Sequence, residues 1–121
     1  MIESEVFPSA GDIYLANLDP TKGSEQAGTR PVIIISAQAM NQRSLRVLVC
    51  PITGNMQPWA TKLALPDNLK TRGMVQTDQI RSIDKSERLL RRIEATPHAY
   101  LLTVRSYVGR LLDLEVPFES R

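Results

Sequence analysis

The fold of this chain is decided by the stretch Asp19-Pro20-Thr21-Lys22-Gly23-Ser24-Glu25-Gln26-Ala27-Gly28-Thr29-Arg30-Pro31, which runs directly into Val32-Ile33-Ile34-Ile35. From Asp19 to Thr29 there is hardly an apolar side chain, so this part predicts an exposed loop. Long loops of this kind in compact domains tend to be functional. The following segment is β-branched throughout, which is typical of a central strand covered on both faces.

Further strands are predicted on both sides of this stretch, because short apolar or alternating runs stand there between turn signals. They cover Ile13–Leu18, Arg46–Cys50 ended by Pro51, Lys62–Leu65, and Met74–Ile83. The last segment is unusual, since Gln76, Asp78 and Ile80 share one side of it. A β-bulge or a functional face would explain this pattern. Residues 54–60 predict a second polar loop, which carries Met56 and Trp59.

The C-terminal part predicts one amphipathic helix. Thr96 is a suitable N-cap, and Pro97 fits the first helical position. Apolar side chains then recur at spacings of three and four through about Asp113, at Tyr100, Leu101, Val104, Val108, Leu111 and Leu112. Several short strands and one such helix indicate a mostly β fold with α, a small β-barrel on which the helix packs.

Length and composition bound the possibilities. With 121 residues, 42% of them hydrophobic and 23% charged, the chain is expected to form a single domain over residues 1–121, with residues 1–10 as a loosely ordered lead-in. The formal net charge of +2 allows a polyanionic partner without requiring one. Two Phe, three Tyr and one Trp are too few for a surface that stacks several bases.

The chain has no segment of about 20 apolar residues and no apolar signal core after its acidic first residues, so we expect a cytoplasmic protein without a membrane span. It also lacks the usual catalytic signatures. The single Cys50 stands in an apolar run and is expected to be buried and inert. Neither a zinc-type ligand cluster nor a glycine-rich phosphate loop is present, so we expect no metal and no cofactor. His98, the one histidine, is expected on the surface.

Four segments, taken in order, closely resemble the MazF/PemK family of toxin ribonucleases. They are Gly11-Asp12-Ile13, Asp19 to Pro31, Val49-Cys50-Pro51-Ile52-Thr53, and Thr77-Asp78-Gln79-Ile80-Arg81-Ser82-Ile83. The resemblance spans residues 10–114, and its most specific part is Pro20 to Pro31.

The resemblance implies an SH3-like small barrel, a homodimer, and the toxin of a type II toxin–antitoxin system. It also implies metal-independent cleavage of single-stranded RNA, in which a 2′-hydroxyl attacks phosphorus and leaves 2′,3′-cyclic phosphate and 5′-hydroxyl ends. The partners it implies are mRNA and a cognate MazE-like antitoxin, whose acidic extended C-terminal segment covers the RNA groove. The alternative is a non-catalytic barrel that acts by protein contact, as a gyrase poison does. The presence of both Arg30 and Thr53 argues against that alternative.

Arg30 matches the arginine of the family motif, and Thr53 matches the threonine that ends the neighbouring strand. A guanidinium is a rigid fork of donors suited to phosphate oxygens, and a hydroxyl adds a donor beside it. Because the pKa of arginine lies above about 12, we expect charge stabilisation from Arg30 before proton transfer. Two structural alternatives stay open. Arg30 would anchor the loop through backbone carbonyls, and Thr53 would only cap a turn.

The resemblance leaves the general base open. Asp78 and Gln79 match a family pair near the active site, but the position two before Asp78 is Gln76, where some relatives carry an Arg that works with the aspartate. Similarly, Ser24 stands where some relatives have a histidine. Asp78 is therefore the first candidate for the base and Glu25 a weaker one.

RNA selection is expected from the two loops and the strand beside them. The expected RNA contacts are Lys22, Ser24, Glu25, Gln26 and Thr29 in the first loop, Asn55 and Gln57 in the second, and Gln79 and Arg81. Their donors and acceptors suit unstacked base edges or phosphates. Trp59 has two open interpretations, a base-stacking surface or a core residue.

Overall fold

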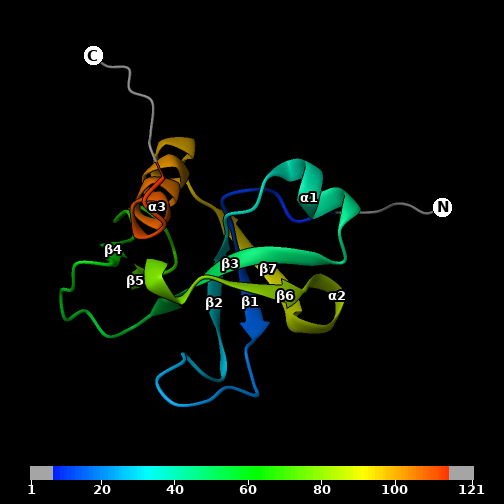
Figure 1. Ribbon diagram of the computed structural model, residues 1–121, viewed down its shortest axis with the longest axis horizontal. Coiled ribbons are helices and arrows are strands. Elements are labelled where there is room, and N and C mark those ends of the chain that lie inside the picture. The colour runs from blue at the N-terminus through cyan, green and yellow to red at the C-terminus, as the bar shows by residue number, and fades with distance from the viewer. Residues whose placement is uncertain (1–6, 115–121) are drawn as a thin grey trace.

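An antiparallel sheet of seven strands runs through residues 7–114, the part of the chain that the computed structural model describes (Figure 1). The strands are β1 (Asp12–Asn17), β2 (Thr29–Ile34), β3 (Arg46–Thr53), β4 (Lys62–Ala64), β5 (Met74–Gln76), β6 (Arg81–Asp84) and β7 (Leu89–Ala95). The helices are α1 (Gln38–Arg43), α2 (Lys85–Arg88) and α3 (His98–Leu111), with a 3-10 turn, η1 (Thr77–Gln79), between β5 and β6. The strand order is β4-β5-β3-β2-β1-β7, and β6 pairs with the first half of β3.

The central strand β2 buries side chains on both faces of the sheet. On one face, Val32 and Ile34 belong to a cluster with Ala16, Leu18, Val47, Val49 and Ile83. On the other face, Ile33 belongs to a cluster with Ile13, Cys50, Ile52 and the α3 residues Leu101, Val104 and Val108. The amphipathic helix therefore covers only the second face, as Figure 1 shows. The first face is buried because the sheet bends around it.

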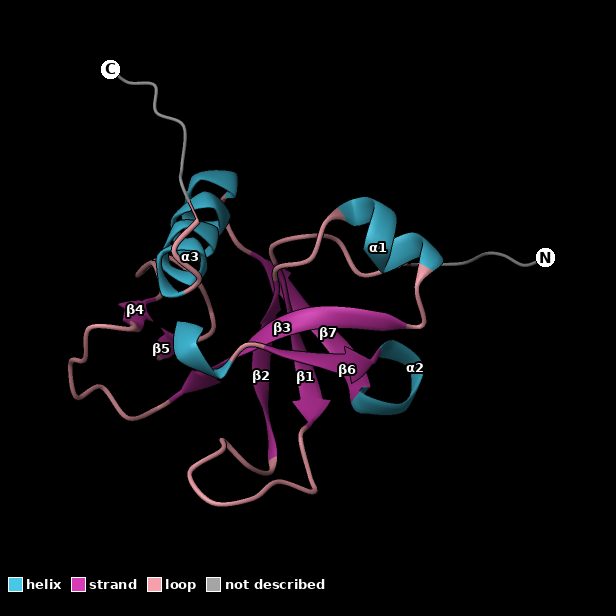
Figure 2. Cartoon of the chain, viewed as in Figure 1, coloured by secondary structure: helices cyan, strands magenta, loops and turns pink. Residues whose placement is uncertain are grey.

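The bend does not close the sheet into a complete barrel, since β6 and β7 are not paired in the described residues. Figure 2 shows β6, α2 and β7 at this side of the sheet, where arginine side chains connect β6 and α2 to the end of β1. Arg81 on β6 donates from Nη1 to the backbone oxygen of Leu18 at 3.2 Å. Arg88 on α2 donates to the backbone oxygens of Asn17 and Asp19. The result is a barrel-like sheet whose open edge is linked by arginine side chains.

The expectation of a mostly β fold with a C-terminal helix is confirmed, with differences at element ends. β3 continues through Pro51, which was expected to end it, and Pro51 pairs with Val32 as the last step of the β2–β3 ladder. A proline has no N–H with which to extend that ladder. The segment from Met74 to Ile83 is not one strand. The turn η1 interrupts it, which explains the odd alternation.

Helix α3 begins one residue later than expected. Pro97 has extended backbone angles and is the N-cap, so Thr96 is not. The Thr96 hydroxyl instead donates to the backbone oxygen of Gly11 at 2.8 Å and ties the helix start to the sheet. The helices α1 and α2 and the edge strand β7 were not predicted.

The expected lead-in lies partly outside the described residues, because the description begins at residue 7. Within it, Ser9 donates its N–H to Asp12 Oδ2 at 3.1 Å, and Ala10 donates to Gln38 Oε1 at 3.2 Å. Over the described residues, no helix is long and apolar enough to cross a membrane.

Gly73 provides a stability test. Its φ is +136°, and a Cβ there would lie 2.5 Å from the backbone oxygen of Thr53. We expect Gly73→Ala to lower the free energy of unfolding by about 2–4 kcal/mol in urea titration, because backbone must move. Gly23→Ala is the control, since its φ is +56° but nothing lies within 4 Å. Gly23→Ala should lower the free energy of unfolding by about 1 kcal/mol. Equal losses in the two variants would contradict this explanation.

Candidate functional site

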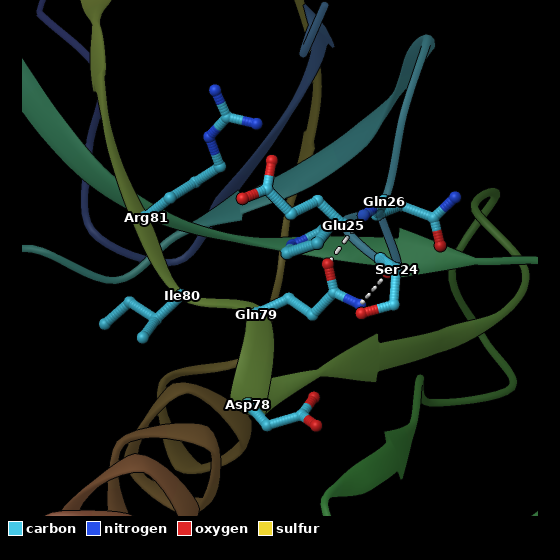
Figure 3. A pocket seen from close by; sticks show the side chains of 8 residues that line it. Ser24, Glu25, Gln26, Asp78, Gln79, Ile80 and Arg81 are labelled. Carbon is cyan, nitrogen blue, oxygen red and sulfur yellow. Dashed lines mark hydrogen bonds between the residues drawn. The ribbon is translucent and has the colours of Figure 1, made fainter. Parts of the chain in front are cut away.

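A polar cavity of about 440 Å³ lies where the β1–β2 loop meets η1 and β3 (Figure 3). It is lined by Ser24, Glu25, Gln26, Pro51, Asp78, Gln79, Ile80 and Arg81. The structure thus gathers six predicted site residues from two distant segments, a loop and a 3-10 turn with the strand that follows it. Pro51 and Ile80 were not predicted to take part, and they form an apolar part of its wall.

The loop is held to the cavity wall by Gln79. Its Oε1 accepts the N–H of Gln26 at 2.7 Å, and its Nε2 donates to the backbone oxygen of Ser24 at 3.3 Å (Figure 3). One side-chain amide therefore pairs with the loop backbone much as a neighbouring strand would. Both contacts are part of the cavity rim, so the loop conformation and the cavity shape depend on Gln79.

The ends of the same loop are fixed by contacts within it. Leu18 donates its N–H to the backbone oxygen of Gly28 at 3.0 Å, and Gly28 donates back to Asp19 Oδ1 at 3.0 Å. Nearer the tip, Lys22 donates its N–H to Glu25 Oε1 at 3.0 Å. Gly28 has a φ of +83°, a conformation in which glycine is preferred. The loop is thus long but internally organised.

Arg30 lies on β2 directly beyond the loop and is half-buried. Its Nε donates to the backbone oxygen of Ala27 at 2.8 Å, so the arginine does anchor the loop, as the structural alternative expected. The Gln26 amide adds a second acceptor. With its oxygen facing the guanidinium, it accepts from Nε at 2.8 Å and from Nη2 at 3.0 Å. Among the described residues, no acceptor takes a hydrogen from Nη1.

Thr53 lies at the end of β3, and its residue is only 6% exposed. Its Oγ1 accepts the N–H of Asn55 at 3.1 Å, so the turn-capping alternative is also observed. The β2–β3 register pairs Ile34, Ile33 and Val32 with Val49, Cys50 and Pro51. If this register is continued by two residues, Arg30 comes opposite Thr53 on the same face of the sheet. Neither residue lines the cavity, and Arg30 adjoins it through its contact with Gln26.

The charges around the cavity are mixed. Glu25 and Asp78 are exposed carboxylates, and Arg81 supplies a half-buried cation. Burial, and secondarily the negative charge of Asp78, raises the pKa of Cys50 to about 12. The thiol of this buried residue therefore stays protonated, as expected for an inert cysteine.

The remaining predicted RNA contacts lie outside this cavity. Lys22, Thr29, Asn55 and Gln57 are all exposed. The second loop is held by Lys62, whose Nζ donates to the backbone oxygens of Asn55 at 2.8 Å and Gln57 at 2.7 Å. Trp59 is 70% exposed, so the interpretation as a core residue is wrong.

His98, at the start of α3, is exposed as expected. Over residues 7–114, no group of three or more His, Cys, Asp or Glu side chains lies close enough together to hold a metal ion.

A bent antiparallel sheet, one covering helix, and an arginine beside a polar loop cavity define a small barrel-like domain. Residues 9–112 match the model of the PemK-like, MazF-like toxin of type II toxin–antitoxin systems. The chain is 39% identical over 105 residues to endoribonuclease PemK of Escherichia coli, covering 84% of this chain and 77% of that protein. It therefore belongs to the PemK/MazF toxin family.

Solved structures agree with this membership. MazF of Deinococcus radiodurans has a TM-score of 0.85 and 31% identity, over 91% of this chain and 100% of that chain. A MazE–MazF structure from the same organism gives a TM-score of 0.76 and 26% identity, over 92% of this chain and 100% of that chain.

The Gln79 contacts can be tested without any substrate. Gln79→Leu removes the acceptor of the Gln26 N–H, so that amide should exchange with solvent roughly 5-fold faster or more, as expected for one lost hydrogen bond. The Gly28 N–H, whose acceptor is Asp19 Oδ1, is the control within the same loop. NMR exchange rates that rise equally at both amides, or at neither, would show that Gln79 does not hold the loop.

Proposed function

We propose that this protein is the RNA-cleaving toxin of its toxin–antitoxin pair, a metal-independent endoribonuclease that acts on single-stranded mRNA in the cytoplasm. The observation that carries the proposal is the Arg30 guanidinium, anchored at 2.8 Å to the loop yet with Nη1 free of acceptors among the described residues. Such a group is preorganised for a phosphate oxygen and costs little reorganisation when RNA binds. The similarity to endoribonuclease PemK supports the same activity.

The proposed reaction is an internal transfer of the phosphodiester. The ribose 2′-oxygen attacks the adjacent phosphorus while the bond from phosphorus to the 5′-oxygen breaks. The 2′-hydroxyl gives its proton to a base, and the departing 5′-oxygen gains one. This leaves a 2′,3′-cyclic phosphate and a 5′-hydroxyl. Arg30 stabilises the negative charge on the five-coordinate phosphorus, and the Thr53 hydroxyl donates beside it.

Two carboxylates remain candidates for the base, and both line the cavity. Asp78 lies on the rigid turn η1 next to buried Thr77, which is an advantage for a group that must be held in place. Glu25 lies in the loop, where its Oε1 already accepts from Lys22 N–H. We therefore assign the base to Asp78 first and to Glu25 second.

RNA recognition is proposed for the loop residues around the cavity. Ser24, Gln26 and Gln79 offer amide, hydroxyl and backbone groups to one or two unstacked bases. Exposed Lys22 and cavity-lining Arg81 would contact phosphates. Thr29, Asn55, Gln57 and the exposed ring of Trp59 would extend this surface, with the ring stacking on a base.

The proposed partners follow from family membership. The MazE–MazF structure of Deinococcus radiodurans supports a MazE-like antitoxin as the natural inhibitor. We also propose that the toxin acts as a homodimer. Exposed leucines of the described chain, among them Leu102, Leu111 and Leu112 on or just after α3, are available to an interface between copies.

The central role of Arg30 is tested by Arg30→Ala. Loss of the guanidinium should reduce the single-turnover cleavage rate of a mixed-sequence RNA by roughly 1000-fold, because its charge stabilisation is lost. Arg43→Ala, at an exposed position of α1, is the control and should cleave normally. Circular dichroism would establish that both variants fold. A folded Arg30→Ala variant with near wild-type rate would refute the role.

Thr53 gives a graded test. Thr53→Ala should slow turnover by roughly 10- to 1000-fold, as the loss of one stabilising donor usually does. Thr53→Ser keeps the hydroxyl and should recover most of the rate. If both variants slow equally, the methyl group and packing of this buried residue matter, and its hydroxyl does not.

A further inference from the structure

The Gln26 side chain lies between a hydrogen-bond donor and a hydrogen-bond acceptor. On one side the Arg30 guanidinium offers only hydrogen-bond donors. On the other side, Gln76 presents its Oε1 as an acceptor. With the Gln26 nitrogen toward Gln76 and its oxygen toward Arg30, the distances are 2.8 Å to Gln76 Oε1 and 2.8 and 3.0 Å to Arg30 Nε and Nη2. Only this orientation satisfies both partners.

Hydrogen bonds fix the backbone around Gln26, so only the orientation of its side-chain amide can vary. The Gln26 N–H donates to Gln79 Oε1 at 2.7 Å. The next residue, Ala27, accepts from Arg30 Nε at 2.8 Å. Rotation of the Gln26 amide by half a turn would face its NH₂ group toward the guanidinium, donor against donor. The acceptor on Gln76 opposes that rotation.

Gln76 is itself on a rigid part of the fold. It is the last residue of β5 and pairs with Lys62 on β4. The following residue, Thr77, is fully buried, and both its N–H and its hydroxyl donate to the backbone oxygen of Thr61, at 3.0 and 2.6 Å. The acceptor that faces Gln26 is therefore held by the sheet and not by the loop.

We propose that Gln76 is a positioning residue, which acts through the Gln26 amide to hold the Arg30 guanidinium with Nη1 directed away from its protein acceptors and available to RNA phosphate. This inference rests on the proposed function of Arg30. The relay consists of neutral amides, so it needs no ionised partner for the arginine. By this mechanism an arginine at position 76 would be a disadvantage in the present chain, because it would present only donors to Gln26.

The consequence is an ordered series of variants. Gln76→Leu removes the acceptor. It should lower kcat roughly 10-fold and change KM less than about 3-fold, because misplacement of a stabilising group affects the transition state most. Gln76→Glu retains an acceptor and should recover most of that kcat. Gln76→Arg presents donors instead and draws the Gln26 oxygen away from Arg30. It should therefore lower kcat more than Gln76→Leu does, to roughly 100-fold below wild type. Gln42→Leu, the same change at an exposed position of α1, is the control.

Two outcomes in these rates would overturn the proposal. One is a Gln76→Leu variant that loses substrate affinity with unchanged kcat, since that would make Gln76 a binding residue. The other is a Gln76→Arg variant at least as fast as wild type, since an arginine would then work in this site without the amide relay.

A second measurement is independent of cleavage. In NMR spectra of the RNA-free protein, the Arg30 Nε–H should be protected from exchange with water in wild type and in Gln76→Glu. It should exchange several-fold faster in Gln76→Arg. If the wild-type chain does not cleave RNA, the proposed function fails, and this signal still tests the relay. Equal exchange in all variants, with folding confirmed by unchanged β2 amide signals, would contradict it.

Discussion

The pairing of β2 with β3 is the constraint on which the site depends. β2 buries alternate residues on both faces, so a shift by one residue would exchange the two core clusters. That requirement fixes the register in which Val32 pairs with Pro51. Continued by two residues, the same register brings Arg30 opposite Thr53 on one face of the sheet. The chemistry proposed for them thus follows from the packing of the core.

The β1–β2 loop and the Arg30 guanidinium are both held by neutral side chains. Gln79 connects the loop backbone to η1, and Gln26 connects Arg30 to Gln76. Amides provide a donor and an acceptor at fixed spacing without a charge of their own. By the proposed mechanism, the guanidinium is left without an ion-pair partner for RNA, and the nearby carboxylates are left for proton transfer. A direct ion pair with Arg30 would have reduced both.

The sequence predicts the parts of this structure that local patterns control. The β-branched run at Val32–Ile35, the apolar spacing of α3 and the polarity of the β1–β2 loop each identify their element. β7 was missed because Arg91 and Arg92 are exposed on it, so its strand conformation comes from pairing with β1 and not from its own residues. Family resemblance, and not a local pattern, identified Arg30, Thr53 and Asp78 as site residues. The contact of Gln76 with Gln26 joins residues distant in the chain, and no local pattern reveals it.

The central claim is that this chain cuts RNA by 2′-hydroxyl attack without a metal. The most direct test is to incubate the purified protein, free of antitoxin, with a long mixed-sequence RNA in excess EDTA and to determine the chemistry of the new ends. Cleavage is expected to persist and to leave 2′,3′-cyclic phosphate and 5′-hydroxyl ends. RNA that stays intact at high protein concentration, or products with 3′-hydroxyl and 5′-phosphate ends, would contradict the claim.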